Sequence, residues 1–124
     1  MAKLNYFTVG TNKLEEAKAF YDALLGSIEM PAIFDHPRGG RFYRGKGTGL
    51  FAVLGPYDGA EACIGNGTMA GFSFDSKAEV DAFHAKALEL GAKDEGGPGE
   101  RMPNMYFAYF RDLDGNKLCG YHFG

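Results

Sequence analysis

The sequence contains no tryptophan, only two cysteines and three histidines, and no long hydrophobic run. Cys63 and Cys119 lie too far apart for a CxxC motif and do not form a disulfide framework. No apolar stretch approaches the roughly 18 residues that a membrane-spanning helix needs. Polar residues at Lys3, Asn5 and Thr8 interrupt the region where a secretory signal would be apolar. We therefore expect a cytoplasmic protein with reduced thiols.

An excess of positive charge is also absent. The chain has 13 Lys and Arg residues against 16 Asp and Glu residues, a formal net charge of −3. This balance argues against nucleic acid or an anionic membrane as the main partner, since both favour a basic surface. What the chain does contain is 19 glycines and 15% aromatic residues, a composition typical of a turn-rich protein with many strands. Its 124 residues suffice for one domain with a hydrophobic core.

Two segments of the chain follow the same pattern. Each begins with a short apolar strand, at Tyr6 or at Met69, and continues through a polar loop into an amphipathic run that ends at Gly26 or Gly91. Apolar residues recur in both runs at steps of three and four, which predicts two helices. We expect Thr11 or Asn12 to cap the first helix, Ser76 to cap the second, and the two glycines to adopt left-handed C-terminal caps.

Short strand candidates separated by glycine and proline follow each helix. The pattern predicts two βαβββ modules, covering about 1–57 and 68–124, with a linker at about 58–67. The predicted strands after the helices are 27–34, 40–44 and 49–54 in the first module and 92–95, 105–111 and 117–123 in the second. The glycine- and proline-rich stretch 96–104 is interpreted as a mobile loop.

The C-terminal sequence FRDLDGNKL (110–118) contains a tight-turn signal, Asp114-Gly115-Asn116, between two aromatic-rich strands. This motif closely resembles the last hairpin of the glyoxalase, bleomycin-resistance and dioxygenase superfamily, the vicinal oxygen chelate proteins. VGTNKLEEAKAFYDALLG (9–26), GNGTMAGFSF (65–74) and VDAFHAKALELGA (80–92) extend the resemblance over nearly the whole chain. The resemblance implies an α+β fold in which two βαβββ modules form a concave mixed sheet around a cleft, and a homodimer.

In metal-dependent members, the resemblance implies a divalent ion held by His, Gln or Glu side chains on the first and last strand of each half. Here the matching positions are Tyr6, Phe51, Met69 and Cys119, none of which is a usual ligand for such an ion. His36, His84 and His122 form no HxH or HxxxH pair, and we expect His84 at the surface or boundary of the second helix. We therefore predict no metal and no cofactor. The sulfur atoms of Cys119 and Met69 are donors that suit Cu(I), so a Cu(I) site is one interpretation of these two residues. The other interpretation is that both simply pack in the core.

We predict a ligand pocket lined by Tyr6, Phe51, Met69, Cys119 and Tyr121, with no assigned catalytic residue. Such a lining is apolar with a few hydroxyl and thiol groups and suits a small planar organic molecule. A filled core without a cavity is the alternative. Asp112 and Asp114 bracket the turn and are expected to bond backbone amides rather than to act as paired carboxylates.

Three functions are compatible with these features. The first is a metal-independent protein that binds a small organic molecule, as in the bleomycin-resistance branch. The second is a lyase or dioxygenase with unusual ligands, like lactoylglutathione lyase. The third is a non-catalytic dimeric interaction module. The residues at the four ligand positions favour the first.

Overall fold

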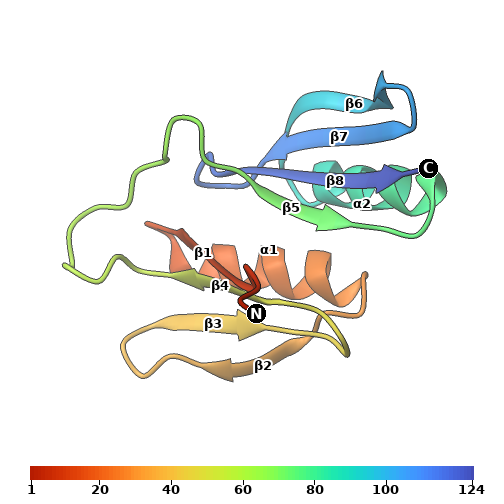
Figure 1. Cartoon of the computed structure of the whole chain (residues 1–124). Coiled ribbons are helices and arrows are strands. Elements are labelled where there is room, and N and C mark those ends of the chain that lie inside the picture. The colour runs from red at the N-terminus through yellow and green to blue at the C-terminus, as the bar shows by residue number, and fades with distance from the viewer. The chain divides into compact units, whose positions relative to one another are not determined.

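Each half of the chain folds as a strand, a helix and three further strands (Figure 1). The computed structural model describes residues 1–124 as two compact units, Met1–Ile64 (unit 1) and Gly65–Gly124 (unit 2). The prediction of an α+β fold built from two βαβββ modules is confirmed.

Unit 1 is a four-stranded mixed sheet with one helix against one of its faces. The strands lie in the order β1-β4-β3-β2, with β1 parallel to β4 and the other pairs antiparallel. Buried aromatic and aliphatic side chains of the helix, such as Phe20, Tyr21 and Leu24, form the core with the sheet. The elements are β1 (Tyr6–Gly10), α1 (Leu14–Gly26), β2 (Ala32–Asp35), β3 (Gly40–Tyr43) and β4 (Leu50–Leu54).

Unit 2 repeats this plan. Its strands lie in the order β5-β8-β7-β6, with β5 parallel to β8. Phe83 on the helix and Phe110 on the sheet, both almost completely buried, lie at the centre of its core. The elements are β5 (Ala70–Ser73), α2 (Lys77–Glu89), β6 (Lys93–Met102), β7 (Met105–Arg111) and β8 (Lys117–Phe123). No helix in the structure is both long and apolar enough to cross a membrane.

The helix ends agree only partly with the predictions. Ser76 caps α2 as predicted, because its hydroxyl accepts a hydrogen bond from the backbone N–H of Glu79 at 3.2 Å. The prediction for α1 is wrong: its N-cap residue is Lys13, with no side-chain cap, and Asn12 instead bonds the backbone of Ala62.

At the other end of the helices, Gly91 adopts the predicted left-handed conformation, with φ of 105°. Gly26 does not, since α1 runs through it and Ser27 is a right-handed C-cap. The left-handed residue after α1 is Glu29, with φ of 62°. The turn around Glu29 delays the next strand, so β2 begins at Ala32 rather than at the predicted residue 27.

The interpretation of 96–104 as a mobile loop is wrong for most of that stretch. Residues up to Met102 belong to β6, which pairs with β7 through several register shifts. Since β6 is an outer strand of its sheet, Pro98 interrupts no pairing on a second side, and positive φ at Gly96 fits a bulge.

His84 is also placed differently from the prediction. Its side chain is buried rather than at the surface, and its Nε2 lies 3.0 Å from an Asp94 carboxylate oxygen. Asp94 also accepts the backbone N–H of Gly96. That backbone bond, together with the bond to His84, lowers the pKa of the Asp94 carboxyl group below its usual range. This contact joins α2 to the outer strand β6.

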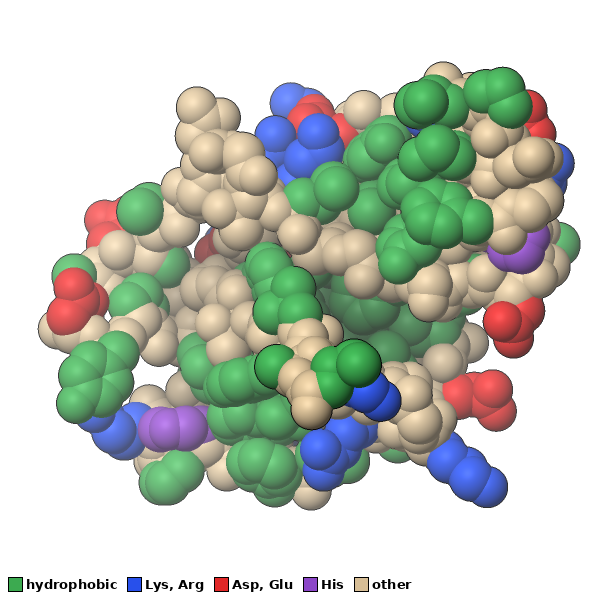
Figure 2. Space-filling model, in the orientation of Figure 1, with side chains coloured by type: hydrophobic (Ala, Val, Ile, Leu, Met, Phe, Trp, Pro, Cys, Tyr) green, Lys and Arg blue, Asp and Glu red, His purple; other side chains and the backbone are tan.

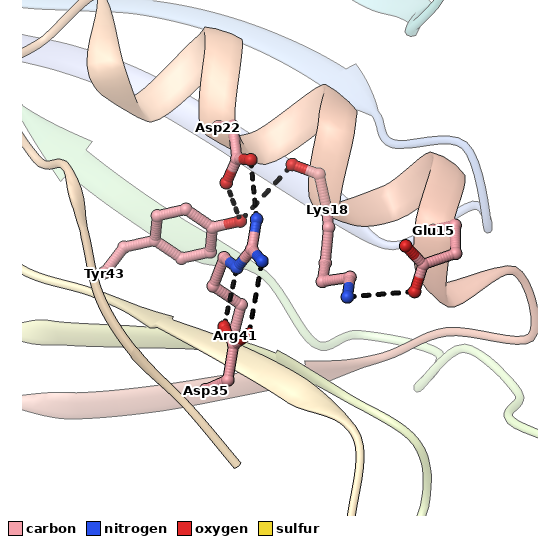
Figure 3. A network of polar contacts seen from close by, with 6 residues as sticks. All are labelled: Glu15, Lys18, Asp22, Asp35, Arg41 and Tyr43. Atoms are coloured by element: carbon pink, nitrogen blue, oxygen red, sulfur yellow. Dashed lines mark hydrogen bonds and ion pairs between the residues drawn. The ribbon is translucent and has the colours of Figure 1, made fainter.

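A polar network performs the same role in unit 1 (Figure 3). Arg41 on β3 donates to Asp35 on β2 at 2.7 Å and to Asp22 on α1 at 2.7 Å. The buried Tyr43 donates its hydroxyl proton to the other oxygen of Asp22 at 2.8 Å. Burial, with the nearby Asp22 carboxylate, raises the pKa of Tyr43 well above its usual range, so the hydroxyl stays protonated. The network therefore fixes the helix against the outer half of the sheet.

Candidate functional site

Each sheet has one face covered by its own helix and one face that its helix does not cover, which we call the helix-free face (Figure 1). Side chains alternate between the two faces along each strand. In unit 1, Tyr43 and Phe51 are cross-strand partners on the α1 side, where Tyr21 contacts both rings. In unit 2, Phe72 and Phe110 lie on the α2 side, against Phe83. The residues that alternate with these along each strand therefore belong to the helix-free faces.

The helix-free face of unit 1 is aromatic. Phe42 is its centre, with the ring of Phe34 stacked at a centroid distance of 4.4 Å and that of Tyr6 at 6.3 Å. The three rings are nearly parallel, at interplanar angles of 17° and 22° to Phe42. Tyr6 and Phe34 are each 52% exposed, whereas Phe42 between them is 7% exposed, so only the two outer rings of the row are open to solvent.

The helix-free face of unit 2 carries a second row. Phe107 and Tyr121 are cross-strand partners with centroids 5.3 Å apart and rings 18° from parallel. Tyr109 continues the row at 5.8 Å and 12° from Phe107, and Phe123 packs against Tyr121 at 4.9 Å. Figure 2 shows hydrophobic side chains gathered over β6, β7 and β8, with Lys and Arg side chains beside one end of them.

Four of the five predicted pocket residues lie on these faces or next to them. Tyr6 is on the helix-free face of unit 1, while Cys119 and Tyr121 are on that of unit 2. Met69 directly precedes β5 and is 39% exposed.

Phe51 is the exception, since it is 3% exposed and packs against Tyr21 on the helix side. In unit 1, the residue equivalent to Cys119 is Ala52, which directly follows Phe51. Ala52 pairs with Thr8 in the way that Cys119 pairs with Gly71. A shift of one residue along a strand moves a side chain to the opposite face.

The corrected positions are Tyr6 and Ala52 in unit 1 and Met69 and Cys119 in unit 2, and none of these side chains is a usual ligand for a divalent metal ion. A methyl group offers no donor, and a thioether is a poor ligand for a borderline or hard cation. Burial raises the pKa of the Cys119 thiol to about 11, so the free thiol is neutral at pH 7. No group of three or more His, Cys, Asp or Glu side chains in the structure is arranged to hold a metal ion.

Cys119 also lacks the partners of a nucleophile. Its in-register neighbours are Gly71 and Tyr109, and a Cβ placed on Gly71 would lie 3.3 Å from its sulfur. Lys117 is the cation that acts on it, but desolvation outweighs that charge and the thiol stays neutral. His122 lies on the opposite side of β8, as predicted, with Nδ1 2.8 Å from the carbonyl oxygen of Phe74. This face therefore offers aromatic surface, and the buried, neutral thiol of Cys119 has no base beside it.

Sequence reasoning missed Phe34, Phe42 and Phe107 as members of these faces. It also missed Lys117 and Arg101, which lie over the ring of Tyr109 at 5.1 and 5.4 Å from its centroid. Two-residue alternation from Cys119 and Tyr121 does predict Lys117 and Phe123 on the same face. The contact of Arg101 depends on the register shifts in β6, which no local pattern shows.

The chain consists of two βαβββ units, and in each unit the first strand pairs in parallel with the last. This arrangement defines the class of this protein. The chain belongs to the glyoxalase/bleomycin resistance protein/dioxygenase superfamily, whose family model matches residues 3–119. A glyoxalase/bleomycin resistance protein from Albidiferax ferrireducens T118 is similar over 99% of this chain and 100% of its own, at 39% identity and a TM-score of 0.89.

Two more distant structures share the fold. A family enzyme from Burkholderia phytofirmans PsJN is 21% identical, with a TM-score of 0.75 and coverage of 97% of this chain and 98% of its own. A lactoylglutathione lyase from Agrobacterium tumefaciens is 22% identical, with a TM-score of 0.72 and coverage of 98% and 93%. No curated protein matches the chain.

Proposed function

We propose that this protein is a metal-independent binding protein for a small, planar aromatic molecule. The observation that carries the proposal is the row of nearly parallel rings on a helix-free face: Tyr109, Phe107 and Tyr121 lie within 18° of parallel along the row. Parallel rings in a row form a continuous apolar surface against which a planar aromatic molecule packs. Tyr6 and Tyr121 supply hydroxyl groups on these faces.

The alternative of a metal-dependent lyase or dioxygenase has less support. None of the side chains at Tyr6, Ala52, Met69 and Cys119 is an imidazole or a carboxylate, the groups that hold a catalytic divalent ion. The similarity to the lactoylglutathione lyase supports a shared fold alone at its 22% identity. Binding a molecule without reaction requires neither a base nor a metal. The groups present on the helix-free faces are therefore sufficient for the proposed function.

A thermal-shift screen tests the proposal. We expect planar aromatic compounds to raise the melting temperature by several degrees at saturation, since a ligand at 100 times its Kd stabilises by about 2.7 kcal/mol. Aliphatic compounds of equal size serve as controls. A screen in which no aromatic compound shifts the melting temperature would favour an interaction module instead. Elemental analysis of the same preparation adds a second check, because one bound divalent ion per chain would support the lyase alternative.

We also propose that the protein works as a homodimer in the cytoplasm. The outer strand β2 is exposed along its length, and Ile33 and Phe34 are 41% and 52% exposed on it. Unpaired strand edges with apolar side chains favour association, most commonly in a two-fold pair. Light scattering should give a mass of twice 13.5 kDa at micromolar concentration. A mass of a single chain across the whole concentration range would contradict the dimer.

A further inference from the structure

We propose that the ligand carries an anionic group, and that Lys117 and Arg101 bind this group beside the ring of Tyr109. The inference rests on the proposed function, because it assumes that the helix-free face of unit 2 binds an aromatic molecule. It adds the class of ligand: a planar ring bearing a carboxylate or another acidic group.

The first observation is the position of the two cations. Tyr109 lies at the end of the aromatic row, on β7, in register with Cys119 on β8. Lys117 is two residues before Cys119 on the same face, and its Nζ is 5.1 Å from the Tyr109 ring centroid. The guanidinium of Arg101, on the outer strand β6, is 5.4 Å from the same centroid. Both cations therefore lie at the end of the ring surface.

The second observation is that neither cation is neutralised by a carboxylate. Arg101 donates to the backbone carbonyl oxygens of Gly97 and Gly99 at 2.7 and 2.9 Å, and neither it nor Lys117 forms an ion pair with an acidic residue. Arg111, also on this face, differs, because its Nε lies 2.9 Å from Glu95. The charge of Arg111 is therefore already balanced, whereas Lys117 and Arg101 are available to an incoming anion.

The third observation is that these side chains are held in place before any ligand arrives. The two carbonyl bonds orient the Arg101 guanidinium, and they use two of its five N–H donors. Contact with the ring face orients Lys117, whose side chain is partly covered. An anion that reaches them makes charge-assisted hydrogen bonds with little loss of side-chain entropy. A planar ligand can then pack its ring against the aromatic row and direct its acidic group toward Lys117 and Arg101, beside Tyr109.

Calorimetry with two matched probes tests the inference. Naphthalene-2-carboxylate and naphthalene-2-carboxamide have nearly the same shape and differ in charge. We expect the carboxylate to bind roughly tenfold more tightly at low salt, and its advantage to fall as salt screens the cations. Lys117→Gln and Arg101→Gln should each weaken carboxylate binding by roughly five- to tenfold and leave carboxamide binding unchanged.

Two variants serve as controls. Lys117→Arg retains the charge and should retain the preference for the carboxylate. Lys86→Gln removes a lysine of α2 that lies near Glu89, away from this face, and should behave as the wild type. Equal binding of both probes, unaffected by Lys117→Gln, would overturn the anion inference and leave the proposed function intact. Absence of binding by either probe would overturn both.

Discussion

Replacing Phe83 with alanine is expected to lower the free energy of unfolding by about 3–5 kcal/mol. Phe83 is 1% exposed, and its ring lies 5.4 Å from Phe72, 5.0 Å from Phe74 and 5.4 Å from Phe110. Gly120 permits this packing, because a Cβ there would lie 2.8 Å from the Phe83 ring. Truncation removes the buried ring and leaves a cavity among aromatic neighbours that cannot close around it.

Guanidinium unfolding followed by circular dichroism measures this loss. The matched control is Phe123→Ala, because Phe123 is 59% exposed on the helix-free face. We expect that control to cost less than about 1 kcal/mol. Hydrogen exchange should show lost protection in α2, β7 and β8 for Phe83→Ala alone. Similar losses for the two variants would contradict the assignment of Phe83 to the core and of Phe123 to an open face.

Local signals predicted much of this fold. The three- and four-residue spacing of apolar side chains predicted both helices, and Ser76 followed by Glu79 predicted where α2 begins. The Asp114-Gly115-Asn116 turn was equally clear. Gly115 has φ of 94°, and an oxygen of the Asp112 carboxylate accepts the backbone N–H groups of Asp114 and Asn116. These features depend on contacts within a few residues, so the sequence alone is enough to predict them.

The length of β6 could not be predicted in the same way. The sequence EGGPGERM has the composition of a loop, yet it pairs with β7 as an outer strand. Pairing with a strand that follows it in the chain supplies the hydrogen bonds, and its bulges accommodate the glycines. Strand formation is here a consequence of tertiary pairing rather than of local preference.

The candidate site shows the same limit. Tyr6 and Cys119 were placed correctly on their strands, but Phe51 was chosen where Ala52 is the equivalent position. The register between β1 and β4 decides which of these neighbours faces the helix, and it depends on residues more than forty positions apart. Apolar residues fill all of Leu50–Leu54, so the strand has no alternation that could have revealed its faces.

The second large effect concerns the two thiols. Cys119 is expected to react with dithionitrobenzoate on the order of 100-fold more slowly than Cys63 at pH 8. Cys63 is exposed, whereas Cys119 is 1% exposed and burial raises the pKa of its thiol to about 11. Only about one Cys119 thiol in a thousand is then ionised at pH 8, and the thiolate is the reactive form.

Release of the coloured thiolate should show a fast and a slow phase, each equal to one thiol per chain. Cys63→Ser should remove the fast phase and Cys119→Ser the slow one. Because the pKa is raised, the slow rate should increase about tenfold per pH unit up to about pH 11, while the protein remains folded. If Cys119 reacted as fast as Cys63 at pH 8, its thiol would be accessible and its pKa would not be raised. Cys119 would then be able to act as a soft-metal ligand or as a nucleophile. The proposal of a metal-independent binding protein would lose its strongest support at that position.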